Sequence, residues 1–282
     1  GYTWGEDLFS FRIPGIEGDG LRMAWEIGAA KGPMELERML NFESPNMAQQ
    51  FPCALGFAQP RALAVNRRGE RICNEYILQN RAVASNIADR QPGRCIYLIL
   101  SDEVVKQYRR SGVDWVNGVF HGNPMERFEE QVAQAMVEYP NSFFSADSLA
   151  ELAAAIGMDP DTLEATAAAY NASCGIGYDE LYCKPHRYLT PIRGSRFYAM
   201  RQVIGGYSTL GGIKIDSRFR VLDEGGKAIE GLYAASSDVC NLYNGTYLYY
   251  FAGNSMGFAL NSGRLAAEHA AEYLNEEEDA DS

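Results

Sequence analysis

Residues 211–255 constrain the fold of this chain more than any other stretch. They contain a glycine pair at 211–212, a short apolar run at 232–235, and a glycine directly before a helical pattern that starts at Asn254. The apolar run is bounded by glycine and serine, which is typical of a short buried strand. A buried strand that ends in polar residues and is followed by a glycine-led helix indicates a fold that mixes strands and helices.

The rest of the chain also alternates between helical and extended patterns. Helices are expected directly after Gly18-Asp19-Gly20, over 149–156 with Asp147 or Ser145 as the N-cap, over 160–174 with Asp159 as the N-cap and Gly175 after its end, and from Asn254 to about Tyr273. Strands are expected at 62–65, 70–73, 96–100, 214–216, 220–222 and 232–235. These patterns predict an α+β fold.

Composition excludes several classes of protein. A length of 282 residues suggests about two domains, and the net charge of -12 argues against nucleic acid or an anionic membrane surface as a partner. The longest apolar run, at 95–100, is too short to span a bilayer. No C-x-x-C pair occurs, and His121, His186 and His269 are too few and too scattered for a metal site. We therefore expect a soluble protein without a metal, and the sequence assigns it to no compartment.

The start of the last helix offers a site for negative charge. Backbone N–H groups at a helix N-terminus lack intrahelical partners, and the helix dipole favours an anion there. A reduced flavin carries negative charge on one edge of its ring, so this geometry suits it. The alternative is that the glycines only allow tight packing of an ordinary strand, loop and helix. The residues by themselves leave both interpretations open.

The order of the motifs resembles one known family. The chain reads G-D-G at 18–20, V-N-R-R-G-E-R-I-C-N-E at 65–75, G-G-I-K-I-D at 211–216, G-L-Y-A-A at 231–235 and G-N-S-M-G-F-A-L-N-S-G-R at 253–264. This series is similar to the FAD-dependent fumarate reductase and succinate dehydrogenase flavoprotein family, in the superfamily of flavocytochrome c and ketosteroid dehydrogenases. The resemblance covers nearly the whole chain.

The resemblance implies a domain plan. Residues 1–48 would be a partial segment of the FAD-binding domain, 49–195 a substrate or capping domain, and 196–282 the C-terminal part of the α/β FAD-binding domain. The family's phosphate-binding G-x-G-x-x-G loop does not occur in this sequence. We therefore expect the main dinucleotide-binding segment to lie before Gly1, and binding of FAD by this chain alone to require a test.

The resemblance also assigns residues to the cofactor. These are Asp19, Asp238, Gly253, Asn254, Ser255 and Met256. Asp19 is the acid of G-D-G, and it equally suits the N-cap of a helix. Asp238 matches, with an offset of one residue, an acid that the family places against the ribityl chain. Ser255 and Met256 match the positions whose backbone N–H groups face the flavin.

Four further residues are candidates for the substrate side. Tyr207 and Tyr250 stand where fumarate-type members carry the His and Arg that grip a dicarboxylate, so fumarate or succinate is not the expected substrate. Arg81, in N-R-A-V-A-S, matches the Arg that donates a proton in those reductases, and the alternative is a surface or structural ion pair. Tyr249 begins Y-Y-F-A-G-N-S-M-G, which resembles the pattern in ketosteroid dehydrogenases that polarises a carbonyl. The alternative is that the clustered tyrosines Tyr243, Tyr247, Tyr249 and Tyr250 only pack between domains.

Three functions follow as hypotheses. The first is an FAD enzyme that transfers a hydride between flavin and a carbon–carbon bond conjugated to a carbonyl, with a small-molecule substrate and possibly an electron-donor protein. The second is a ketosteroid dehydrogenase-like enzyme with an apolar ring substrate. The third is a catalytically silent substrate-binding fragment without bound flavin.

Overall fold

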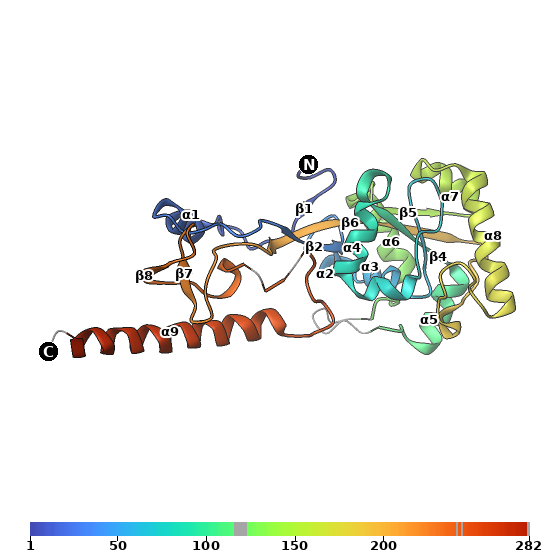
Figure 1. The fold of residues 1–282 in the computed structure, drawn as a ribbon. Helices are drawn as coiled ribbons and strands as arrows, with labels where there is room; N and C mark the ends of the chain where they lie inside the picture. The colour runs from blue at the N-terminus through green and yellow to red at the C-terminus, as the bar shows by residue number, and fades with distance from the viewer. Residues whose placement is uncertain (116–122, 241, 244, 281–282) are drawn as a thin grey trace. The chain divides into compact units, whose positions relative to one another are not determined.

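The computed structural model describes residues 1–115, 123–240, 242–243 and 245–280, and the side chains of these residues up to 275. The chain forms two compact units, whose helices and strands are labelled on the ribbon in Figure 1. Unit 1 comprises Gly1–Phe11 and Met39–Gly205, and unit 2 comprises Arg12–Arg38 and Gly206–Ser282. The domain boundaries predicted from the sequence, at 48/49 and 195/196, differ from these divisions. The assignment of either unit to a flavin or a substrate domain stays a prediction.

Unit 1 is built on a six-stranded sheet. The strands are β1 (Phe9–Ser10), β2 (Leu36–Asn41), β3 (Leu63–Val65), β4 (Ile96–Ser101), β5 (Phe143–Ala146) and β6 (Phe197–Thr209). The sheet runs β1-β6-β4-β3, and β2 and β5 also pair with β6. β4 is buried along its whole length, as its continuous run of apolar residues predicts.

Short and long helices complete unit 1. They are α2 (Met47–Gln50), α3 (Cys53–Phe57), α4 (Arg81–Asp89), α5 (Asp102–Ser111), α6 (Phe128–Glu138), α7 (Leu149–Ile156) and α8 (Pro160–Ile176), with 3₁₀ turns η1 (Glu75–Gln79), η2 (Pro92–Arg94) and η3 (His186–Tyr188). α7 packs against α8 and β5, and α5 packs against β4. This places Leu152, Leu163 and Val104 in the core.

Capping explains where two of these helices begin. Asp159 caps α8 as expected, because its Oδ2 accepts a hydrogen bond from Thr162 N at 3.1 Å. The predicted caps of α7 were wrong: Ser148 Oγ accepts from Glu151 N at 3.1 Å instead. Asp147 and Ser145 are occupied elsewhere, since Arg196 donates to Asp147 Oδ1 at 2.6 Å and to Ser145 Oγ at 2.8 Å. α8 also ends later than predicted, at Gly177 with φ 74° rather than at Gly175.

A buried cluster of charged side chains ties the η1 segment of unit 1 to residues 179–184. Arg71 donates two hydrogen bonds to Glu75, both at 2.9 Å, and two to Asp179, both at 2.8 Å. Lys184 Nζ lies 3.1 Å from Glu75 Oε2 and donates to Tyr170 Oη at 2.7 Å. Two cations therefore face two carboxylates in a region closed to water, which makes each partner hard to remove.

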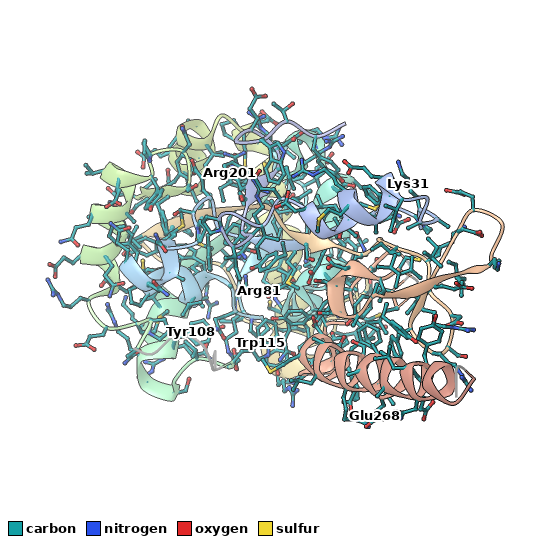
Figure 2. The ribbon with its side chains drawn as sticks, turned by 90° about the vertical axis from the view of Figure 1, so that its left-hand side faces the viewer. Lys31, Arg81, Tyr108, Trp115, Arg201 and Glu268 are labelled. Atoms are coloured by element: carbon teal, nitrogen blue, oxygen red, sulfur yellow. The ribbon has the colours of Figure 1, made fainter. Side chains whose placement is uncertain are left out.

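Unit 2 contains α1 (Asp19–Glu26), the hairpin of β7 (Arg220–Leu222) and β8 (Ala228–Tyr233), the 3₁₀ turn η4 (Ser236–Asp238), and α9 (Asn254–Ala280). Its small core holds Leu21, Ala24, Ala29, Ile213 and Val221. Trp25 packs against this core, and the ammonium of Lys31, marked in Figure 2, lies 4.9 Å from the centre of the Trp25 ring.

Two predictions about helices in unit 2 need correction. Asp19 is not the N-cap of α1, because Gly18 takes that position with φ 78° while the Asp19 carboxylate pairs with Arg22. α9 begins at Asn254 as expected but continues to Ala280, beyond the predicted end at Tyr273. The predicted α+β class is confirmed.

The glycine pair of unit 2 has a packing role. A Cβ atom at Gly211 would lie 1.5 Å from Pro33 O, and one at Gly212 would lie 2.2 Å from Asp238 O. The close approach serves hydrogen bonds, because Ile213 N donates to Asp238 O at 2.8 Å and Gly32 N donates to Gly212 O at 2.7 Å. Only glycine allows three backbones to meet this closely.

Candidate functional site

The N-terminus of α9 presents two free donors in unit 2. Gly253 precedes the helix with φ 76°, and its carbonyl accepts the first helical hydrogen bond from Gly257 N at 2.7 Å. Asn254 N donates to Phe251 O at 3.2 Å. Within the described part of the chain, the N–H groups of Ser255 and Met256 have no acceptor. The helix dipole places partial positive charge at the same end of the helix as these two N–H groups. An electron-rich group is therefore favoured here.

The G-D-G and S-S-D segments meet in unit 2. The Asp238 carboxylate lies 3.5 Å from the position that a Cβ atom would take at Gly20. Asp238 is an exposed residue, but its surroundings remove part of the water from the carboxyl group, which raises its pKa above the ordinary value. η4 is held against α9, because Ser236 N donates to Ser262 Oγ at 2.9 Å. Two segments far apart in the sequence are thus brought together beside α9.

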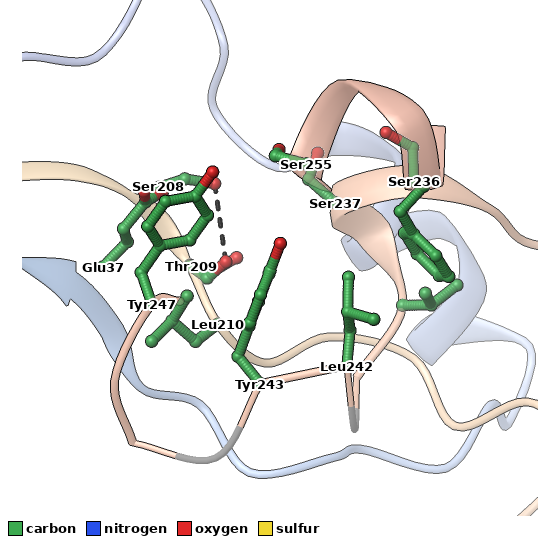
Figure 3. Close-up of a pocket in the computed structure, with 12 residues that line it drawn as sticks. Glu37, Ser208, Thr209, Leu210, Ser236, Ser237, Leu242, Tyr243, Tyr247 and Ser255 are labelled. Carbon is green, nitrogen blue, oxygen red and sulfur yellow. Dashed lines mark hydrogen bonds between the residues drawn. The ribbon is translucent and has the colours of Figure 1, made fainter. Parts of the chain in front are cut away.

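A small pocket with a cavity volume of about 40 Å³, partly open to solvent, lies next to this helix start (Figure 3). Its wall is formed by Glu37, Ser208, Thr209, Leu210, Ser236, Ser237, Val239, Leu242, Tyr243, Tyr247, Ser255 and Phe258. Its polar lining comes from serine, threonine and tyrosine hydroxyls and from the Glu37 carboxyl. In Figure 3, Tyr243 and Tyr247 rise from the same loop with their hydroxyl ends directed into the pocket.

Asn254 positions the two tyrosines. Its Oδ1 accepts a hydrogen bond from the Tyr243 hydroxyl, and its Nδ2 donates to the Tyr247 hydroxyl at 3.2 Å and to Leu248 O at 3.0 Å. The rings of Tyr243 and Tyr247 have centroids 5.0 Å apart. The side chain of Asn254 is therefore engaged with its own loop, and its predicted contact with the cofactor stays a prediction.

Burial raises the pKa of two ionisable groups in the wall of the pocket. Burial, followed by the nearby Tyr247 and Glu37, raises the pKa of Tyr243 to about 12. Burial also raises the pKa of Glu37 above its ordinary value. At neutral pH Tyr243 is a protonated phenol, and it donates its one O–H to Asn254 Oδ1, so its oxygen lone pairs remain as acceptors toward the pocket.

The predicted substrate tyrosines lie around this pocket rather than in its wall. Tyr207 is half-buried on β6, and the next two residues, Ser208 and Thr209, line the pocket. Tyr250 is 63% exposed, and Tyr249 N donates to Tyr247 O at 3.0 Å. Sequence reasoning weighed Tyr243 and Tyr247 only as packing residues and passed over Glu37. The tyrosine-rich segment directly before Asn254 was the available signal for Tyr243 and Tyr247.

Arg81 lies in unit 1 as the first residue of α4 (marked in Figure 2). Its Nη1 donates to Leu40 O at 3.1 Å and to Asn41 Oδ1 at 3.3 Å, and its guanidinium lies 5.4 Å from the centre of the Phe42 ring. These contacts hold the guanidinium on β2 and the residue after it. Its predicted role as a proton donor stays a prediction.

Neither a cluster of metal ligands nor a membrane-spanning helix occurs among the described residues. In that part of the chain no three His, Cys, Asp or Glu side chains gather as potential metal ligands, and His121 lies outside it. No described helix is both long and apolar enough to cross a membrane.

Comparison with known proteins decides the family. A family model described as FAD binding domain matches residues 5–255. The chain belongs to this family. The predicted resemblance to FAD-dependent fumarate reductase and succinate dehydrogenase flavoproteins is therefore confirmed.

Two relatives illustrate the range of the family. The chain is 29% identical over 270 residues to a vinyl phenol reductase of Lactiplantibacillus plantarum, which covers 92% of this chain and 54% of that protein. It is 28% identical over 269 residues to a fumarate reductase (cytochrome) of Shewanella frigidimarina, covering 94% of this chain and 41% of that protein. The chain thus spans about half or less of the length of these curated relatives.

A solved structure shows the same fold. The 3-ketosteroid Δ1-dehydrogenase of Sterolibacterium denitrificans superposes with a TM-score of 0.70 at 24% identity, over 94% of this chain and 48% of that chain.

The residues present fit one part of FAD. The free N–H groups of Ser255 and Met256 are donors for an electron-rich ring edge, and the Asp238 carboxyl is a partner for hydroxyl groups. The pyrophosphate of FAD needs a glycine-rich loop at a helix start, and no G-x-G-x-x-G occurs in the sequence. The donor set therefore suits the flavin and ribityl half of the cofactor.

Proposed function

We propose that this chain is part of an FAD-dependent oxidoreductase that transfers a hydride between the flavin and a carbon–carbon bond conjugated to a carbonyl. The observation that carries the proposal is the pair of free N–H groups at Ser255 and Met256, at the positions where the family pattern faces the flavin. The family match over residues 5–255 supports it. When bound, FAD supplies the acceptor or donor of the hydride.

The residues of unit 2 would hold the cofactor in distinct ways. Ser255 and Met256 would offer backbone N–H groups, Gly253 would keep the approach to them free of a side chain, and Asp238 would accept hydrogen bonds from hydroxyl groups. Asp19 would add negative charge at the start of α1. These roles extend the family pattern to this chain's own residues.

The substrate side would be neutral and aromatic. The phenols of Tyr207, Tyr249 and Tyr250 would orient a carbonyl substrate in place of cationic side chains, and Arg81 would deliver a proton. Tyr243 adds a protonated phenol to the pocket wall, held in place by its hydrogen bond to Asn254 Oδ1. A pocket without a cationic clamp favours an enone or an unsaturated acid derivative over a dicarboxylate. An electron-donor protein is part of the same proposal.

Binding of FAD by the chain tests the cofactor assignment. Ser255→Pro removes one free N–H group, and proline is tolerated in the first turn of a helix, so the helix is retained. We expect Ser255→Pro to weaken FAD binding about tenfold or more, as for the loss of a hydrogen bond to a charged group. A titration followed by the flavin absorption bands in the near-ultraviolet and blue measures this.

Ser255→Ala is the matched control, because it removes the hydroxyl and keeps the N–H group. Equal FAD affinities for Ser255→Pro and Ser255→Ala would contradict the assignment of this helix start to the flavin. If the unsubstituted chain leaves the flavin spectrum unchanged, the chain is the flavin-free binding fragment of the third hypothesis.

Turnover in the complete protein tests the substrate side. We expect Tyr249→Phe and Tyr250→Phe each to reduce kcat by about a hundredfold, the size of a lost positioned donor. Initial rates with a small enoate and with a steroid-like enone measure this, with Tyr233→Phe on β8 as the control. Unchanged turnover would refute the role of both tyrosines, and a preference for the steroid would select the ketosteroid dehydrogenase-like alternative.

A further inference from the structure

A second hollow lies wholly within unit 1 and has no place in the proposed flavin chemistry. It has a cavity volume of about 290 Å³ and is partly open to solvent. Its polar lining comes from Arg67, Cys95, Tyr97, Asn141 and Arg201, and Phe144 and Ile156 add apolar wall. Arg201 is marked in Figure 2. A hollow of this size accommodates a small molecule.

The sheet register brings its central groups together. Tyr97 on β4 is paired with Arg201 on β6, and also with Val65 on β3. Directly paired residues project from the same face of an antiparallel sheet, so Tyr97 and Arg201 share one face. Arg67 follows β3 by two residues. The Arg67 side chain passes close to the backbone of Gly93, since a Cβ atom at Gly93 would lie 2.8 Å from the Arg67 Cδ.

The hollow carries uncompensated positive charge. None of its lining residues is acidic. Arg201 donates from Nη2 to the backbone carbonyl of Glu6 at 3.3 Å. Within the described residues, neither Arg67 nor Arg201 forms an ion pair with a carboxylate. Two guanidinium groups beside one hollow, in a chain with a net charge of -12, leave a local site for an anion.

Tyr97 adds a neutral donor between them. The residue is 5% exposed, and its ring lies 6.2 Å from that of Phe144. Burial and the neighbouring Cys95 raise the pKa of Tyr97 to about 12, while Arg201 and Arg67 act in the opposite direction. The phenol therefore stays protonated at neutral pH. A protonated phenol can donate to an anion.

We propose that this hollow binds a small molecule through its phosphate or carboxylate group, held between Arg67 and Arg201 with the Tyr97 hydroxyl as a third donor. Guanidinium groups match the paired oxygens of both anions. The apolar wall of Phe144 and Ile156 would receive the remainder of the molecule. The site belongs to unit 1 and is independent of the flavin assignment in unit 2.

Isothermal titration calorimetry of the 282-residue chain, in a low-salt buffer without phosphate or carboxylate, tests this proposal. Inorganic phosphate is the first probe and acetate the second, and the tighter one identifies the anion class. We expect Arg201→Gln and Arg67→Gln each to weaken binding about tenfold or more, as for a hydrogen bond between charged groups. Tyr97→Phe keeps the ring packed and should weaken binding about threefold.

Arg110→Gln is the matched control, because Arg110 is an exposed arginine on α5 outside the lining of the hollow. It changes the net charge equally and should leave the affinity unchanged. Circular dichroism of each variant verifies that the fold is retained. If an arginine variant fails to fold, the affinity of Tyr97→Phe tests the proposal in its place. The proposal is overturned if neither anion binds saturably, or if Arg110→Gln weakens binding as much as Arg201→Gln.

Discussion

The substitution Glu75→Gln is expected to lower the free energy of unfolding by about 3–5 kcal/mol, the cost of leaving buried charges without their partner. Glu75 has 0% exposure and joins Arg71, Lys184 and the backbone N–H of Ala64. Glutamine has nearly the same shape, so packing changes little. The loss therefore measures the charge together with the acceptor oxygen that the amide group replaces. Urea titration followed by circular dichroism at pH 7 gives the value.

The matched control is Glu103→Gln, which also removes a glutamate from an arginine pair. Glu103 Oε2 lies 2.9 Å from Arg193 Nε, but the two side chains are 47% and 67% exposed. Exposed pairs contribute less than about 1 kcal/mol, so this variant should unfold almost as the unsubstituted chain does. Equal losses for Glu75→Gln and Glu103→Gln would show that burial of the cluster does not govern its strength.

The effect of Glu75→Gln should also depend on pH. Burial alone would raise the pKa of Glu75, but Lys184 and Arg71 outweigh it and hold the pKa below its ordinary value of 4.5. As the pH falls below 4.5, the unfolded state takes up a proton that the native state does not. The contribution of Glu75 is thus complete above that pH and is lost as the pH falls through the native pKa. The difference in free energy of unfolding between the unsubstituted chain and Glu75→Gln should therefore narrow in acid.

Gly211→Ala is expected to destabilise unit 2 by about 3 kcal/mol or more, at the upper end of overpacking effects. The new Cβ atom would lie 1.5 Å from Pro33 O and 2.8 Å from the Met34 Cα atom. Both neighbours are backbone atoms, so no rotation of a side chain relieves the clash. The segment must move away, which breaks the alignment that carries the bond from Ile213 N to Asp238 O. Urea titration of the variant measures the loss.

Gly263→Ala provides a control with the opposite sign. Gly263 lies within α9, and a Cβ atom there would meet nothing within 4 Å. Alanine should stabilise the helix by roughly 0.5–1 kcal/mol, because glycine loses more backbone freedom on folding. If Gly211→Ala were tolerated as well as Gly263→Ala, the packing role of the glycine pair would be refuted.

The sequence by itself determined features that depend on neighbours along the chain. Asp159 before Pro160 predicts the start of α8, and the apolar run that begins at Ile96 predicts β4, because caps and periodicity act within a few residues. The order of motifs likewise indicated the family that the match over residues 5–255 confirms. Capping failed where a distant partner intervened, since Arg196 engages both Asp147 and Ser145.

The tertiary structure alone decided which distant residues meet. Nothing local to Gly211 shows that Pro33 lies against it, and nothing local to Arg67 shows that it shares a hollow with Arg201. The same holds for Glu75, whose partner Lys184 lies far along the chain. The local pattern of residue types reflects backbone preference and burial. Binding sites depend instead on sheet register and on contacts between segments that are remote in sequence. This is the physical reason that α8 and β4 could be predicted and the pocket walls could not.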